Sequence, residues 1–195
     1  SLVVAGAEYQ QLIAGIAPSL SSVRRYFGIG GHGAPFVPFS ELDSADALPS
    51  DLAVRADDGF VIIHTAAVGG KPRGALLSQA NLLIGQSPLI QALALSEQDV
   101  NYGALPLFHV TGLGLMLTLQ QVGGASVIAA KFDAAQAARD IAAEKATLLA
   151  EFAPMLGNLL DQAQTGERAT LRAVTGLDTP DTIERVQAAN QRGIF

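Results

Sequence analysis

The residues best suited to chemistry lie in a short, basic and glycine-rich segment, residues 64–74. Gly69 and Gly70 can adopt positive φ angles and turn successive backbone N–H groups toward one point, as in an anion-binding nest. Lys71 and Arg73 add two cations at alternating positions beside this glycine pair. The segment therefore predicts a cradle for a polyphosphate. It is not a Walker A loop, because a proline follows the lysine. A glycine-rich hairpin with two solvated cations is the alternative.

Segment 64–74 and the stretch after it resemble the phosphate loop of the adenylate-forming enzymes, which include acyl-CoA synthetases, luciferases and peptide-synthetase adenylation domains. The family pattern is Tyr-Thr-Ser-Gly-Thr-Thr-Gly-Lys-Pro-Lys-Gly, followed by a short strand and a helix that contains Asn-Leu. The matching positions are Thr65, Gly70, Lys71, Pro72, Gly74, Asn81 and Leu82, with Arg73 as a conservative match. The resemblance implies that the phosphates of ATP are bound by Thr65, Gly69, Gly70, Lys71, Arg73 and Gly74.

Four consecutive positions inside the loop depart from this family pattern, and three hydroxyl groups are missing there as a result. Ala66 replaces a serine, Ala67 replaces a glycine, and Val68 and Gly69 replace threonines. A hydrogen bond to a charged group is worth roughly 1.5–3 kcal/mol. We therefore expect triphosphate binding to be weaker by about tenfold to thousandfold unless backbone donors compensate.

A second segment, Leu105–Leu113, resembles the family motif Pro-Leu-Phe-His-x-x-Gly and follows the phosphate loop by about 35 residues, as in the family. The resemblance implies that Phe108, His109 and Gly112 line the acyl or carboxylate pocket. A neutral imidazole at His109 can orient a carboxylate or gate the pocket. Taken alone, a single histidine before an apolar helix is more typical of a core or capping residue.

A third segment, Leu171–Gly176, looks like the strand and glycine that lead to the adenine-binding loop of the same family. Gly176 is therefore the expected adenine contact. The usual Gly-Ala-Ala/Glu-Pro continuation is altered here to Gly-Leu-Asp-Thr-Pro, which weakens this part of the resemblance.

The elements that must position these motifs follow an alternating pattern of apolar runs and helical segments. Phe60–Thr65, with adjacent β-branched residues, predicts a buried strand. The other expected strands are Leu2–Ala5, Val23–Ile29, Ala75–Leu77, Val100–Leu105, Ser126–Ala130, Thr147–Ala150 and Leu171–Thr175. The expected helices are Glu8–Ile16, Asn81–Leu93, Gly112–Leu119, Asp133–Lys145, Pro154–Gln162 and Thr179–Asn190, with N-caps at Ser78 and Asp133. This rhythm predicts a doubly wound α/β fold, with helices on both faces of a mostly parallel sheet. Residues 1–195 are expected to form a single α/β subdomain.

Composition removes several classes of protein. The net charge of −6 argues against nucleic acid as a partner. The absence of cysteine excludes disulfides, iron–sulfur clusters and thiolate catalysis. No two of His32, His64 and His109 have the i, i+4 spacing of a helical metal site, so we expect no metal bound by histidines. The apolar stretch Val110–Val122 is short of the ~20 residues of a membrane span. We therefore expect a cytoplasmic protein without a membrane span.

A glycine pattern near the N-terminus imitates a different site. Gly28, Gly30 and Gly33 match the dinucleotide fingerprint by letter. That fingerprint needs a helix to begin directly after it, and Pro35 and Pro38 oppose one. We therefore do not expect a nicotinamide-cofactor site here.

The resemblance implies the reaction of an acyl-CoA synthetase. A carboxylic acid, with a fatty acid as the first expectation, is joined to AMP from ATP with Mg²⁺, and the acyl group then passes to coenzyme A. The family's Tyr-Gly-x-Thr-Glu motif, ribose aspartate, hinge and mobile lysine do not occur in residues 1–195. We therefore expect an internal part of the large N-terminal domain, inactive alone and prone to self-association through exposed edges.

Two other interpretations stay open from the sequence. The first is a degenerate, non-catalytic homologue that serves as a binding or scaffold domain, which the altered stretch Ala66–Gly69 suggests. The second is an unrelated α/β domain that binds a phosphate or nucleotide, which would require both motifs to be coincidental.

Overall fold

The computed structural model describes residues 1–31, 33–43, 53–162, 170–177 and 179–190. It divides into two compact units, Ser1–Ala53 and Val54–Phe195. The first unit contains β1 (Leu2–Gly6), α1 (Ala7–Ile16), η1 (Ala17–Ser19), β2 (Arg25–Ile29), β3 (Phe36–Pro38) and η2 (Phe39–Leu42). Its three strands form a parallel sheet in the order β1-β2-β3. The predicted strand, helix and strand of this region are confirmed.

The glycine cluster of the first unit serves to turn the chain between two strands. Gly30 and Gly31 have φ angles of +76° and +144° directly after β2. Gln10, on α1, donates from Nε2 to the carbonyl of Gly31 at 2.9 Å and holds this turn. The next regular element is the strand β3, as the prolines predicted. His32 lies outside the described residues.

The second unit begins with an antiparallel pair of strands, β4 (Gly59–His64) and β5 (Gly74–Ser78), whose register places His64 opposite Gly74. The prediction of a buried strand here is wrong, since Phe60 and Ile62 are 47% and 57% exposed. A run of apolar residues is typical of a strand in the interior of a sheet, which has a neighbouring strand on each side and is therefore buried. Among the described residues β4 pairs with β5 alone, and Phe60 and Ile62 lie on its exposed face.

Two short helices follow β5, α2 (Gln79–Gly85) and α3 (Ser87–Ala92). Ser78 caps α2 as predicted. The Ser78 hydroxyl accepts a hydrogen bond from the backbone N–H of Asn81 at 3.2 Å, and the Asn81 side chain accepts from the N–H of Ser78 at 3.0 Å. This reciprocal capping box fixes the direction in which the chain leaves the β4–β5 hairpin.

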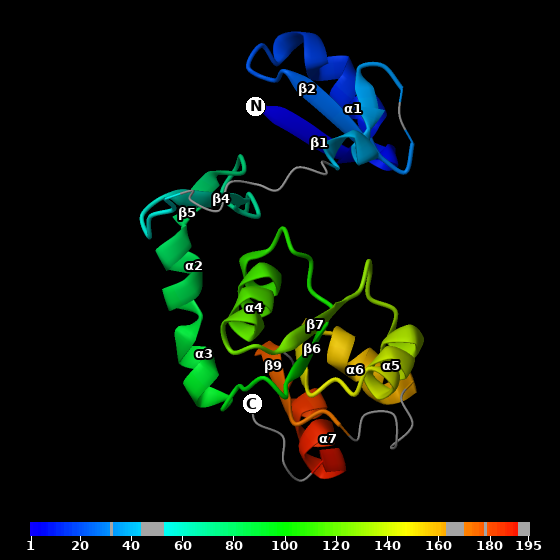
Figure 1. The fold of residues 1–195 in the computed structure, drawn as a ribbon. Coiled ribbons are helices and arrows are strands. Elements are labelled where there is room, and N and C mark those ends of the chain that lie inside the picture. The colour runs from blue at the N-terminus through cyan, green and yellow to red at the C-terminus, as the bar shows by residue number, and fades with distance from the viewer. Residues whose placement is uncertain (32, 44–52, 163–169, 178, 191–195) are drawn as a thin grey trace. The chain divides into compact units, whose positions relative to one another are not determined.

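The rest of the unit alternates strand and helix around a four-stranded parallel sheet in the order β7-β6-β8-β9 (Figure 1). Its elements are β6 (Val100–Gly103), α4 (Val110–Gln121), β7 (Ala125–Ile128), α5 (Ala134–Ala143), β8 (Leu148–Phe152), α6 (Met155–Gln162), β9 (Ala173–Leu177) and α7 (Pro180–Asn190). Asp133 caps α5 as predicted, because its carboxylate accepts from the N–H of Gln136 at 2.8 Å.

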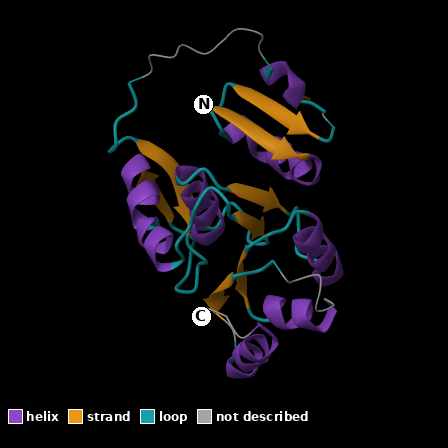
Figure 2. Cartoon of the chain, turned by 60° about the horizontal axis from the view of Figure 1, so that its bottom comes forward, coloured by secondary structure: helices purple, strands orange, loops and turns teal. Residues whose placement is uncertain are grey.

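Helices cover both faces of this sheet (Figure 2). On one face, Leu115 and Leu119 of α4 pack against Leu148 and Ala150 of β8. On the other face, the buried residues of α5 and α6 pack against the intervening strand positions, among them Tyr102, Leu149 and Val174. Alternate residues of each strand therefore belong to different cores, as in a doubly wound sheet. The predicted α/β fold class is confirmed.

The strand order reverses between β6 and β8. From β6 the chain passes through α4 to β7 on one side, and then returns past β6 to form β8 and β9 on the other side. Open α/β sheets bind ligands outside the carboxyl ends of their strands at such a reversal point. The segment after β6 and the end of β8 are therefore the places where a site is expected.

An ion pair with a buried carboxylate ties the opposite edge of the sheet, where β6, β8 and β9 begin. Asp99 is 3% exposed and accepts from Nε and Nη2 of Arg172, each at 2.7 Å, and from the Thr147 hydroxyl at 2.8 Å. Burial raises the pKa of Asp99, but the donors of Arg172 and Thr147 and the Ser96 backbone N–H outweigh it and lower the pKa to about 2. This network holds three strand starts together.

No helix in the described ranges combines the length and hydrophobicity that crossing a bilayer requires. The most apolar candidate, α4, has 12 residues.

Candidate functional site

The predicted phosphate loop is the connection between β4 and β5. Thr65 closes the base of this loop twice. Its backbone N–H donates to the carbonyl of Arg73 at 3.0 Å, and its hydroxyl accepts from the N–H of Arg73 at 3.1 Å. Across the tip, the N–H of Gly70 donates to the carbonyl of Ala67 at 2.9 Å. The loop is thus a hydrogen-bonded turn whose two ends are held in register by a threonine.

The tip of the loop needs backbone conformations that most residues avoid. Gly70 has a φ of +128°, which glycine adopts without penalty. Ala67 has a φ of +58°, in the left-handed region, and it stands where the family pattern has glycine. An alanine there costs about 1 kcal/mol relative to glycine. The chain has therefore kept the shape that glycine favours while replacing the glycine.

The loop surrounds an open depression of about 380 Å³. Its wall is made by Thr65, Ala66, Ala67, Val68, Gly69, Lys71 and Arg73. Within the ranges that the structure describes, neither Lys71 nor Arg73 forms a salt bridge. Two cations without a carboxylate partner beside a turn of exposed backbone suit an anionic ligand. Val68, where the family pattern has threonine, is 97% exposed and brings no donor to this depression.

Two of the residues predicted to bind phosphate, Gly70 and Gly74, have structural roles in the hairpin. Gly70 sets the turn described above. Gly74 begins β5, and a Cβ at this position would come within 2.7 Å of Cγ2 of Ile62. The binding roles of Thr65, Gly69, Gly70, Lys71, Arg73 and Gly74 stay predictions.

His109 lies at the reversal point of the sheet and caps α4. Its Nδ1 accepts a hydrogen bond from the backbone N–H of Thr111 at 3.2 Å. In the neutral ring the proton is therefore on Nε2, and this atom makes no hydrogen bond in the described part of the chain. The imidazole meets the ring of Phe152, the last residue of β8, edge to face with 5.7 Å between centroids. The capping role that the sequence left open is confirmed, and it leaves one N–H donor for a ligand.

Gly112 allows α4 to begin where it does. A Cβ on this residue would lie 2.5 Å from the carbonyl oxygen of Pro106 and 2.7 Å from that of Leu105. The first turn of α4 therefore rests directly on the backbone of the preceding segment. Phe108 is 79% exposed, so its side chain packs little against its own unit. The pocket roles of Phe108, His109 and Gly112 stay predictions.

Gly176 lies in β9, in register with Glu151 of β8. A Cβ at Gly176 would be 2.1 Å from the carbonyl oxygen of Glu151, so the close approach of these strands requires glycine. Because β6, β8 and β9 are parallel, Gly176 lies toward the same edge of the sheet as His109 and Phe152. The fold thus brings the second and third motifs to one edge, while the adenine contact stays a prediction.

Sequence reasoning missed Phe152 as the neighbour of His109. The sequence predicted a strand at Thr147–Ala150 and a helix at Pro154–Gln162, but nothing local marks the Phe152 ring as a contact of a residue over 40 positions earlier. Among residues whose placement the structure gives, no group of three or more His, Asp or Glu side chains could hold a metal ion.

Comparison with protein families gives one match that spans most of the chain. The model of a family described as AMP-binding enzyme matches residues 13–193. A crystal structure assigned as a long-chain-fatty-acid CoA ligase of Rhodopseudomonas palustris CGA009 is 62% identical, with a TM-score of 0.92 over 100% of this chain and 49% of that one. ATP-bound MatB from Rhodopseudomonas palustris, at 23% identity and a TM-score of 0.78 over 97% of this chain and 38% of that one, shares the fold.

Curated relatives are acid–CoA ligases. Indoleacetate–CoA ligase from Aromatoleum aromaticum is 30% identical over 98% of this chain and 42% of its own length. Feruloyl-CoA synthase from an Amycolatopsis species is 32% identical over 58% of this chain and 23% of its own length. The chain therefore spans less than half the length of each of these relatives.

Proposed function

This chain belongs to the AMP-binding enzyme family, and from that premise we propose that the protein containing it is an ATP-dependent acid–CoA ligase. It would join a carboxylic acid to AMP with release of pyrophosphate and then transfer the acyl group to coenzyme A. The observation that carries the proposal is the β4–β5 loop, where Lys71 and Arg73 line an open depression and have no salt-bridge partner among the described residues.

The loop supplies charge and donors for a triphosphate. Lys71 and Arg73 both line the depression, and each can offer a charge-assisted hydrogen bond. Residues 65–74 contain no Asp or Glu, so this donor set suits phosphate oxygens and not a metal ion. Mg²⁺ would enter with the nucleotide, where it neutralises phosphate charge.

His109 has the geometry to orient the acid. With Nδ1 committed to the N–H of Thr111, the neutral ring keeps Nε2–H as a donor for a carboxylate oxygen. The ring also lies edge to face against Phe152. We therefore assign His109 the role of positioning the carboxylate at the carboxyl edge of the sheet.

The class of the acid substrate is proposed from the names of the similar proteins. The 62% identical structure carries the name of a long-chain-fatty-acid CoA ligase, which supports a fatty acid. The curated relatives carry the names of indoleacetate and feruloyl ligases, which support an aromatic acid. A substrate panel must contain both classes.

The test is acid-dependent ATP–pyrophosphate exchange by the full-length protein, with short, long and aromatic acids. Lys71→Ala is the test variant, and Lys131→Ala, an exposed lysine outside the loop, is the matched control. Loss of one charge-assisted hydrogen bond predicts an exchange rate lower by about 10- to 100-fold in Lys71→Ala and unchanged in Lys131→Ala. The chain of residues 1–195 alone is expected to give no exchange, since its relatives are more than twice as long.

A second function is favoured by the altered loop. Three hydroxyls of the family pattern are missing between Ala66 and Gly69, and Val68 presents an apolar side chain to solvent. A non-catalytic homologue that binds a nucleotide or a partner would tolerate these changes. A folded full-length protein that gives no exchange with any acid would support this function over the ligase. Equilibrium dialysis would then measure whether this protein binds ATP.

A further inference from the structure

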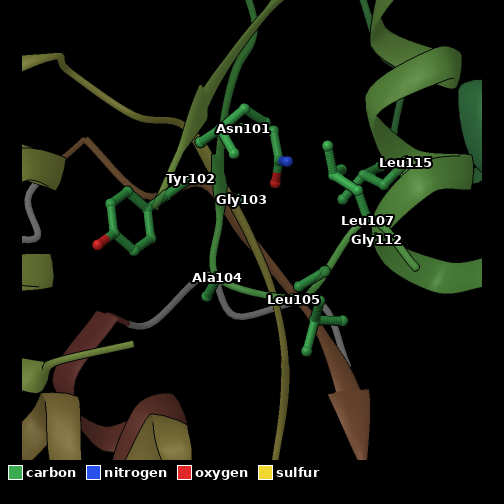
Figure 3. Close-up of a pocket in the computed structure, with 10 residues that line it drawn as sticks. Asn101, Tyr102, Gly103, Ala104, Leu105, Leu107, Gly112 and Leu115 are labelled. Carbon is green, nitrogen blue, oxygen red and sulfur yellow. The ribbon is translucent and has the colours of Figure 1, made fainter. Parts of the chain in front are cut away.

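A small cavity lies between the four-stranded sheet and α4, directly behind the segment that carries His109. Its volume is about 10 Å³, which is the room for one water-sized group. Side chains from β6, from the following segment and from α4 line it, including Asn101, Leu105, Leu107, Gly112 and Leu115 (Figure 3). Apart from Asn101, these groups are apolar or glycine.

Asn101 is the polar exception in this wall. Its side chain is 3% exposed, and its amide oxygen has no hydrogen-bond partner in the portion of the chain with described placement. Figure 3 shows the amide on the side of β6 that faces α4, toward Leu107 and Leu115, while Tyr102 points to the opposite side. A buried amide oxygen without a partner is unfavourable, so a partner is expected when the site is in use.

A second polar atom on the neighbouring strand has the same character. Ser126 of β7 is the register partner of Asn101, so the two side chains lie on the same face of the sheet. The hydroxyl of Ser126 is also buried without a hydrogen-bond partner among the described residues. Two such atoms lie on one face of the sheet, and one of them, on Asn101, belongs to the lining of the cavity. Together they indicate that this layer is built to receive a polar atom.

The position of this cavity beside the segment of His109 connects it to the proposed acid substrate. Leu107 and Gly112 line the cavity and flank His109, to which the carboxylate is assigned above. We propose that Asn101 is a specificity-determining residue, which hydrogen-bonds one hydroxyl or N–H group on the chain or ring of the acid substrate. The proposal rests on the ligase function. A rotated amide can present either an acceptor or a donor, so the shared requirement is one hydrogen-bonding atom.

The experiment uses pairs of acids that differ by one hydroxyl group, phenylacetate with 4-hydroxyphenylacetate and octanoate with 8-hydroxyoctanoate. For the full-length protein, kcat/KM in ATP–pyrophosphate exchange is measured for each acid, and the ratio within each pair is compared between variants. Asn101→Val and Asn101→Thr form a matched pair with the same shape, of which only threonine keeps a hydrogen-bonding group. Thr118→Val is the control, because Thr118 is fully buried in α4 and donates to the carbonyl of Gly114, outside the cavity lining.

The expected result is a preference for the hydroxylated acid in at least one pair, lower by tenfold or more in Asn101→Val. Asn101→Thr should keep part of the preference, and Thr118→Val should keep all of it. Exchange with an unchanged ratio in Asn101→Val would overturn this inference alone, and would leave the cavity as a site for structural water. Absence of exchange with every acid in the unmodified protein would refute the ligase function and this inference with it.

Discussion

Replacing Asp99 by asparagine tests whether its ion pair with Arg172 holds the four-stranded sheet together. The carboxylate accepts from two atoms of Arg172, from the Thr147 hydroxyl and from the backbone N–H of Ser96, the last at 2.9 Å. An asparagine offers one oxygen and one NH₂ group, so its NH₂ group would face one of the hydrogen-bond donors that the Asp99 carboxylate now accepts from. Asp99→Asn is therefore expected to lose the stabilisation that the ionised group provides.

The size of this effect follows from the pKa of Asp99, which falls from 3.8 in the unfolded chain to about 2 in the folded one. A carboxyl group with a lowered pKa stabilises the folded state fully above its unfolded pKa and loses this contribution as the pH falls toward the folded value. Linkage gives about 2 kcal/mol at pH 7, of which about 1 kcal/mol is lost by pH 3. Asp99→Asn should lower stability at pH 7 by about 2 kcal/mol and flatten the decline between pH 5 and pH 3.

The assay is amide hydrogen exchange at β6 and β8, which reports the unfolding of this sheet even within a longer protein. Measurements at pH 5 and pH 3 give the decline in the unfolding free energy of the sheet for the unmodified protein and for Asp99→Asn. Asp57→Asn is the control, since Asp57 pairs with Arg55 at the surface, with side chains 74% and 75% exposed, and such pairs contribute little. Equal declines with pH in the unmodified protein and in Asp99→Asn would refute the reasoning.

Three further substitutions test the elements around the candidate site by thermal unfolding and exchange activity. Gly112→Ala should destabilise the protein by about 1–3 kcal/mol and lower exchange, because the new methyl group overlaps backbone carbonyls. Gly15→Ala, in helix α1 with no atom within 4 Å, is its control and should be neutral or stabilising; equal losses in both would contradict the overlap. Ser78→Ala removes the capping box of α2 and should cost about 1 kcal/mol, and an unchanged Tm would argue against the cap. Ala67→Gly relieves the left-handed backbone at the loop tip and should raise stability by up to about 1 kcal/mol, whereas a lower Tm would show that the loop does not hold this conformation.

The sequence was a reliable guide where the signal is local. Ser78 and Asp133 were expected as N-caps from the residues that follow them, and both cap their helices. The alternation of apolar runs and helices predicted the doubly wound sheet, because each run needs its own cover. The position of the glycine-rich loop, the predicted phosphate loop, between two strands also followed, since residue types and spacing carry that information.

The sequence was a poor guide to burial and to partners. The run from Phe60 to Thr65 was expected to be buried, and it lies instead in a two-stranded ribbon with an exposed face. The composition of an apolar run does not reveal whether the strand it forms has one neighbouring strand or two. The tertiary structure alone determines how many neighbours it meets.

What the sequence by itself determined is the chemistry available to this protein: a basic glycine-rich loop, a histidine before an apolar helix and an alternating α/β pattern. Only the tertiary structure decided which groups meet. Arg172 lies 73 residues after the Asp99 carboxylate that it binds, and His109 reaches the ring of Phe152 only because β6 and β8 are adjacent in the sheet. The amide oxygen of Asn101, which has no hydrogen-bond partner among the described residues, is likewise buried only because α4 closes over β6. Such contacts depend on strand order and packing, which no local pattern encodes.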